Sequence, residues 1–162
     1  MKRFKRVGQV WALPKNVVSL EAFRLRVSVP AHPSHRLFYV AESSCRWLAL
    51  LSSFPFLQID VIPSLLPLKE KLLAHQPDLI IVDAKIEWDD PIRLIEIFAE
   101  LLEVPVVMIY SAENLRQTPE LLKRGFEVGM HDTVQSPLQR DELWESINVL
   151  LKFRGQSFLG RS

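Results

Sequence analysis

The sequence has only one cysteine, Cys45, and this scarcity excludes two kinds of construction. A single thiol cannot form an intrachain disulfide, and it cannot build a metal site made of cysteines. Long apolar runs are also missing, because no stretch reaches the roughly 18 residues that suggest a membrane-spanning helix. We therefore expect a cytoplasmic protein of ordinary globular composition.

Glycine is scarce as well, with five residues in 162. The chain has neither the glycine-rich loop of nucleotide-binding P-loops nor the glycine fingerprint of dinucleotide-binding folds. His131 and Asp132 are adjacent, but no nucleophile lies at a spacing that would make them a catalytic pair. The other histidines, His32, His35 and His75, lack the spacing of metal ligands. The sequence therefore predicts a protein that is not an enzyme.

Charge is unevenly distributed along the chain. Residues 1–36 carry eight basic side chains against Glu21 alone, which gives this arm a charge of +7. The total charge is +1, so the remaining residues sum to −6. A basic arm of this kind can bind nucleic acid or an anionic membrane, or it can be a solvated extension that contacts the acidic body. The pattern leaves both interpretations open.

From residue 36 onward, short apolar runs alternate with segments of helical periodicity. Such alternation predicts a parallel sheet connected by right-handed helical crossovers, and five strands favour the flavodoxin-like order 2-1-3-4-5. The expected strands are Arg36–Ala41, Gln58–Ile62, Asp78–Asp83, Val104–Tyr110 and Gly129–Val134. The expected helices are Cys45–Phe54, a segment opened by Pro63, Pro91–Leu102, Asn114–Phe126 with a late start at Pro119, and Leu138–Phe153.

The pattern divides the chain into an N-terminal extension (1–35), an α/β domain (36–153) and a C-terminal tail (154–162). Within the extension, Phe23–Val29 alternates apolar and polar residues as a half-buried strand does, so the extension can add a strand to the sheet. The alternatives are a strand exchanged between subunits and a poorly ordered tail. In open parallel sheets, ligands bind beyond the carboxyl ends of the strands, which directs attention to the loops that follow them.

Four segments, in order along the chain, resemble the receiver domains of two-component response regulators. Pro77–Asp83 is similar to the third strand of that family, which ends in its phosphoacceptor aspartate. Val104–Ile109 resembles the fourth strand, and Gly129–Pro137 has the family's glycine-to-proline spacing around the fifth. Asp141–Leu143 resembles the start of the last helix. The resemblance implies the same fold for residues 36–153.

The resemblance also implies a set of functional positions, and most of them have changed here. The family uses two acids after strand 1 to hold Mg²⁺, an aspartate after strand 3, a hydroxyl residue after strand 4 and a lysine after strand 5; Mg²⁺ and the lysine neutralise charge on the phosphoryl oxygens. In this chain those positions fall on Ala41 and Glu42, on Asp83, on Tyr110 with Ser111 beside it, and on Ser136.

The missing lysine at Ser136 matters most, because a charge-assisted pair of this kind contributes roughly 1.5–3 kcal/mol. We therefore expect a stand-alone pseudo-receiver that works as a signalling adaptor through protein–protein contacts, independently of phosphorylation. One alternative is an atypical but working receiver phosphorylated at Asp83. Another is a nucleic-acid-binding protein that uses the basic arm. The family implies a protein partner such as a histidine kinase, another regulator or a transcription component.

Three smaller expectations follow. No cofactor is expected, although Glu42 and Asp83 could form a weak Mg²⁺ site; the alternative is a partly exposed acid pair. Asp83 itself could instead cap a loop. Trp144 and Phe153 lie on the last helix, where the family makes dimer and partner contacts, and exposed aromatic side chains there would serve as interface anchors. Ordinary burial of both rings is the alternative.

Overall fold

The computed structural model describes the backbone of residues 35–42, 46–113 and 117–160, with side chains up to Lys152. The chain divides into two units, Met1–Ser34 and His35–Ser162. Residues 1–34 of the basic arm, with the predicted strand Phe23–Val29, and Cys45 lie outside the described residues, so the nucleic-acid hypothesis stays a prediction. Within the described part, no helix has both the length and the apolar character needed to cross a membrane.

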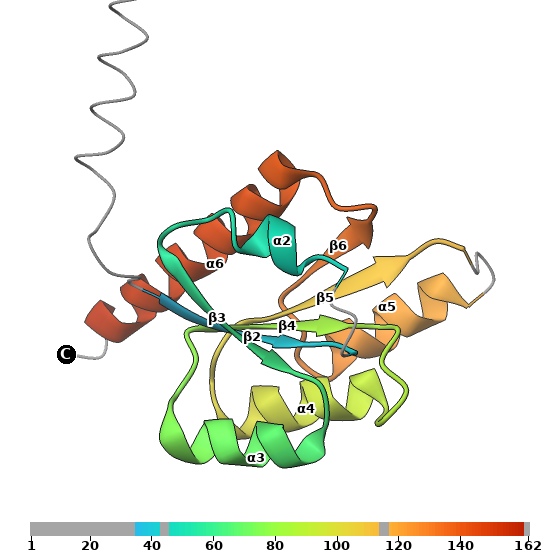
Figure 1. The fold of residues 1–162 in the computed structure, drawn as a ribbon, viewed down its shortest axis with the longest axis horizontal. Coiled ribbons are helices and arrows are strands. Elements are labelled where there is room, and N and C mark those ends of the chain that lie inside the picture. The colour runs from blue at the N-terminus through green and yellow to red at the C-terminus, as the bar shows by residue number, and fades with distance from the viewer. Residues whose placement is uncertain (1–34, 43–45, 114–116, 161–162) are drawn as a thin grey trace, which may run out of the picture. The chain divides into compact units, whose positions relative to one another are not determined.

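The core of the unit His35–Ser162 is a parallel sheet of five strands (Figure 1). The strands are β2 (His35–Val40), β3 (Leu57–Ile62), β4 (Leu79–Asp83), β5 (Val106–Ser111) and β6 (Asp132–Ser136). Their spatial order is β3-β2-β4-β5-β6, and every neighbouring pair is parallel. This arrangement confirms the predicted flavodoxin-like order 2-1-3-4-5.

Helices cover both faces of the sheet, which explains why its strands are almost continuously apolar. On one face, Leu37 and Tyr39 belong to a buried cluster with residues of α2 (Leu48–Leu51) and α6 (Arg140–Gly160). On the other face, Phe38 and Val40 pack in a second cluster with side chains of three other helices. These helices are α3 (Leu65–Ala74), α4 (Pro91–Leu101) and α5 (Thr118–Glu127) (Figure 1).

Two helices differ in length from the sequence prediction. Helix α2 ends at Leu51 and does not reach Phe54. Phe54 precedes Pro55, and the proline ring disfavours the helical conformation of the residue before it. Helix α6, expected to end at Phe153, continues to Gly160. The extra segment contains Gly155, but a single glycine costs a helix only about 1 kcal/mol and no proline stops it.

One charged cluster lies within the sheet, on the edge strand β3. The Asp60 carboxylate pairs with the guanidinium of Arg36 at 2.6 Å and with the ammonium of Lys71 in α3 at 2.8 Å. Burial opposes ionisation of Asp60, but the hydrogen bonds from Lys71 and Arg36 together outweigh it and lower the pKa of the carboxyl below its ordinary value. Asp60 is therefore a neutralised structural anion.

Candidate functional site

Asp83 is the last residue of β4, at the sheet edge where the carboxyl ends of the strands meet. Its Oδ1 accepts a hydrogen bond from the backbone N–H of Lys85 at 2.9 Å, which closes a turn in the loop between β4 and α4. Asp83 is partly exposed, and its Oδ2 has no hydrogen-bond partner among the described residues. An aspartate is thus present at the position of the receiver family's phosphoacceptor, and its Oδ1 accepts a hydrogen bond that stabilises the loop.

Glu42 follows β2 and contacts the same loop from the neighbouring strand. Its Oε1 accepts a hydrogen bond from the backbone N–H of Glu87 at 2.7 Å. The preceding residue, Ala41, is buried and contributes only a methyl group to the core. The two carboxylates that could have held a metal ion therefore both bind backbone amides of residues 85–87.

This donor set fits Mg²⁺ poorly. Mg²⁺ requires near-octahedral oxygen coordination, and proteins supply it through one or more free carboxylates. Here Glu42 and Asp83 each commit an oxygen to the loop, and Ala41 supplies no oxygen. Among the described residues, no group of three or more acidic, histidine or cysteine side chains could hold a metal ion. The weak Mg²⁺ site stays a prediction, and no chemical step is derived from it.

The two residues at the hydroxyl position, both partly exposed, have partners other than Asp83. The Tyr110 hydroxyl donates to Oε1 of Gln135 on β6 at 3.4 Å, a long hydrogen bond. The Ser111 hydroxyl donates to Oε2 of Glu113 at 2.9 Å. Neither contact is directed at the aspartate in this structure.

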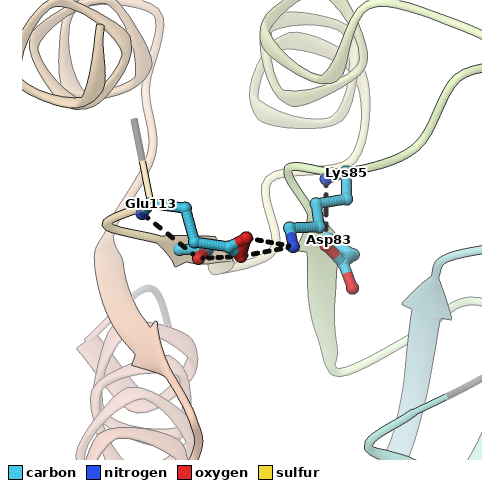
Figure 2. Close-up of polar contacts among 4 residues, drawn as sticks. Asp83, Lys85 and Glu113 are labelled. Atoms are coloured by element: carbon cyan, nitrogen blue, oxygen red, sulfur yellow. Dashed lines mark hydrogen bonds and ion pairs between the residues drawn. The ribbon is translucent and has the colours of Figure 1, made fainter. Parts of the chain in front are cut away.

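Sequence reasoning missed an ion pair that links the two loops next to Asp83. The Lys85 ammonium lies 2.9 Å from Oε2 of Glu113, so the loop after β4 is joined to the loop after β5 (Figure 2). Hydrogen bonds from Lys85 and Ser111 lower the pKa of the Glu113 carboxyl. A signal existed in the sequence, because Lys85 and Glu113 stand two residues after the ends of adjacent parallel strands.

Ser136, at the position of the family's lysine, ends β6 and lies opposite Ser111 in the register of the sheet. Both serines line a cleft of about 390 Å³, together with Arg46 and Trp47, which precede α2. The side chain at position 136 is thus short where a lysine would fill space and supply charge.

Three other polar residues, Asp89, Asp90 and His131, have structural roles. The side chain of Asp90 caps α4 by accepting the N–H of Ile92 at 2.9 Å, and Asp89 pairs with Arg93. His131 accepts the N–H of Val106 through Nδ1, and burial lowers the pKa of its imidazole. None of these contacts involves Asp83.

Of the two aromatic residues predicted as interface anchors, Trp144 has a described side chain and Phe153 does not. The Trp144 ring packs against Phe56 at 4.6 Å and Phe54 at 5.8 Å between centroids. This packing agrees with the burial alternative that the sequence left open. The side chain of Phe153 lies outside the described residues, and the interface role of both residues stays a prediction.

Solved structures with the same fold are receiver domains of response regulators. The receiver domain of the TMAO respiratory system regulator TorR has a TM-score of 0.63 and 23% identity, covering 72% of this chain and 96% of that one. A receiver domain of a putative LuxO repressor from Vibrio parahaemolyticus has a TM-score of 0.63 and 17% identity, covering 79% and 98%.

A third match is NtrX from Brucella abortus, solved in complex with ATP, with a TM-score of 0.61 and 22% identity. The alignment covers 79% of this chain but 28% of NtrX, so this chain spans under a third of that protein. No protein-family model and no curated protein sequence matches the chain. At these identities the comparisons establish the fold, and they confirm what the resemblance implied about it.

Proposed function

We propose that this chain, which has the fold of a response-regulator receiver domain, is a signalling adaptor that acts through protein–protein contacts without phosphorylation of Asp83. The observation that carries the proposal is the placement of the nearby cation. Lys85, two residues after Asp83, pairs its ammonium with Glu113 at 2.9 Å. Among the described residues, no ion pair to Asp83 is formed.

A phosphoryl group on Asp83 would add about −2 units of charge, and its oxygens need cations or hydrogen-bond donors to be stabilised. Ser136 supplies no charge, Lys85 is held by Glu113, and Glu42 is engaged with the loop. The site as built therefore favours an unmodified Asp83.

The proposed contacts with other proteins are supported by exposed apolar side chains on α3. Leu66 and Leu73 lie two helical turns apart, on the same side of the helix, and their exposed fractions are 65% and 90%. Leu65 at the start of α3 is also exposed. Apolar side chains that gather on one helix face are typical of interaction surfaces.

Incubation with acetyl phosphate and Mg²⁺, followed by intact-mass measurement, tests the phosphorylation-free part. We expect wild type and Asp83→Asn to give the same mass after equal incubation. A phosphodonor-competent receiver domain in the same buffer serves as the positive control. The gain of one phosphoryl group by wild type and not by Asp83→Asn would refute this part of the proposal.

A working but atypical receiver is the second candidate, favoured by one observation. Asp83 is partly exposed, and its Oδ2 has no partner among the described residues, so a phosphodonor could reach it. Trp88, in the loop that Asp83 and Glu42 hold, is a local probe of Mg²⁺ binding. The second candidate predicts a saturable fluorescence change in wild type at millimolar Mg²⁺ that is absent from Trp88→Phe. A flat titration would reject it.

A further inference from the structure

Helix α3 carries an apolar stripe on the side that faces away from the sheet. Leu66 and Leu73 are mostly exposed, whereas Leu68 is buried in the same cluster as Phe38 of β2. Seven residues make almost two full turns, so Leu66 and Leu73 lie one above the other and Leu68 points to the opposite side of the helix. In Figure 1, α3 lies at the lower edge of the picture, and no other described element lies beyond it. The stripe is therefore accessible to another protein molecule.

Two opposite charges flank the stripe. Lys69 and Glu70 come between the two leucines in sequence, and the turn of the helix places them on either side of the line that joins the leucines. Both side chains are exposed, and neither forms an ion pair among the described residues. The neighbouring Lys71 differs, because its ammonium pairs with Asp60. The stripe thus has a cation along one side and an anion along the other.

This pattern is complementary to its own copy when the two helices run parallel. About a two-fold axis parallel to the helices, each residue of the stripe contacts the same residue of the second copy, and one flank of the stripe meets the opposite flank. Leu66 and Leu73 then each contact their own copies, and Lys69 lies beside Glu70 of the second copy, twice in each dimer. Antiparallel packing would bring like flanks together, and the like charges would repel.

We propose that the α3 stripe, made of Leu66 and Leu73 with the flanking Lys69 and Glu70, is the interface of a parallel two-fold homodimer. This interface rests on the proposed function, because it gives the α3 surface its partner, a second copy of this chain. Helix α3 has ten residues and is about 15 Å long. A contact of that length is smaller than the roughly 1,200–2,000 Å² of stable interfaces, so the dimer is reversible. Dimerisation would cover the stripe, and dissociation would expose it to other proteins.

Sedimentation equilibrium of the full chain, from about 5 μM to about 1 mM, tests the proposal. We expect a monomer–dimer equilibrium with a Kd on the order of 100 μM. Leu73→Lys should raise the Kd about tenfold or more, because apolar contact is lost and two ammonium groups face each other. Val149→Lys is the matched control, since Val149 is an exposed apolar residue on α6, which covers the other face of the sheet. It should dimerise as wild type does.

Exchange of the flanking charges makes the result independent of folding defects. Lys69→Glu and Glu70→Lys should each raise the Kd about fivefold, because two attractive pairs become repulsive. The double variant, Lys69→Glu with Glu70→Lys, restores both attractive pairs and should return the Kd to about the wild-type value. An equimolar mixture of the two single variants should form heterodimers more tightly than either variant dimerises alone. A damaged fold cannot produce such a rescue.

The parallel orientation is tested by disulfide formation. Cysteines that form a disulfide have Cα atoms about 4.4–6.8 Å apart, and parallel packing places position 73 beside its own copy. In a Cys45→Ser background, Leu73→Cys should therefore oxidise to a covalent dimer faster than Leu101→Cys. Leu101 is the control because it is an exposed leucine on α4, outside the stripe. Antiparallel packing centred on the stripe would hold the two copies of position 73 about 10 Å apart.

Any of four results overturns the proposal: a chain that is monomeric at about 1 mM, equal dissociation constants for wild type and Leu73→Lys, a double charge exchange as weak as the single ones, or equal oxidation of Leu73→Cys and Leu101→Cys. The proposed function fails separately. A monomeric chain whose Asp83 stays unmodified by acetyl phosphate overturns the dimer alone, whereas a dimeric chain phosphorylated at Asp83 overturns the phosphorylation-free adaptor alone.

Discussion

Asp60 and Asp83 are two aspartates on strands of one sheet, and they are neutralised in different ways. Asp60, within β3, is bound by the cations of Arg36 and Lys71. Asp83, at the end of β4, is bound by a backbone N–H, while Lys85 pairs with Glu113 instead. A carboxylate held inside a strand needs opposite charge, whereas one at a strand end can be satisfied by loop amides. Asp60 is therefore a structural site, whereas Asp83 keeps an oxygen that a ligand could bind.

Replacing each aspartate by asparagine should give the largest contrast. Asp60→Asn removes the charge that neutralises Arg36 and Lys71, and we expect a loss of about 2 kcal/mol in the free energy of unfolding. Asp83→Asn keeps an oxygen that can accept from Lys85, so its effect should stay within about 0.5 kcal/mol. Urea denaturation of the three proteins measures both values. Equal losses in the two variants would contradict the distinction.

Giving Asp83 the cation that Asp60 already has sharpens the comparison. Ser136→Lys places an ammonium at the position where the receiver family has its lysine. We expect this variant to gain a measurable acyl-phosphate adduct on incubation with acetyl phosphate and Mg²⁺, under conditions in which wild type gains none, because one charge-assisted pair is added. Intact mass measures the adduct, and Ser136→Met, which adds bulk without charge, is the control. A Ser136→Lys protein that stays as unmodified as the control would show that Ala41 or Tyr110 limits the chemistry.

The pH dependence of stability should separate the two aspartates by a smaller amount. The folded pKa of Asp60 is lowered, so its stabilisation is complete above its ordinary pKa and is lost as the pH falls through the lower folded value. We expect the stability difference between wild type and Asp60→Asn to be constant from about pH 5 to pH 7 and to shrink below about pH 4. Urea denaturation across that range measures it. A difference that persists undiminished at about pH 2 would argue that packing, not charge, explains the effect.

The same contrast explains what the sequence could predict. The alternation of apolar runs and helical segments predicted the five strands, because period and strand burial are local properties, and the fold type that such a chain favours then predicted their order. Local patterns do not predict the ion pair of Lys85 with Glu113. Glu113 lies on another loop, and the contact depends on the register of β4 and β5.

The roles of Glu42 and Trp144 were also beyond local patterns. Glu42 fitted either a metal ligand or one member of a partly exposed acid pair, and Trp144 fitted either an interface contact or a buried one. The structure pairs Glu42 with the N–H of Glu87, a contact between the loops after β2 and β4. It packs Trp144 against aromatic side chains that precede β3. Such contacts between distant segments require the tertiary fold.

The ion pair of Lys85 with Glu113 should contribute least to stability, because both side chains are largely exposed and solvent screens them. Lys85→Met should leave the urea midpoint unchanged within error, in contrast to Asp60→Asn. Its effect should appear instead in the pKa of Glu113, which should rise toward the ordinary value once the Lys85 hydrogen bond is gone. NMR titration of the Glu113 side chain measures this shift, and Lys123→Met, on α5, is the control for a general change in charge. An unchanged pKa of Glu113 would show that the pair does not form in solution, and Lys85 would then be free to approach Asp83.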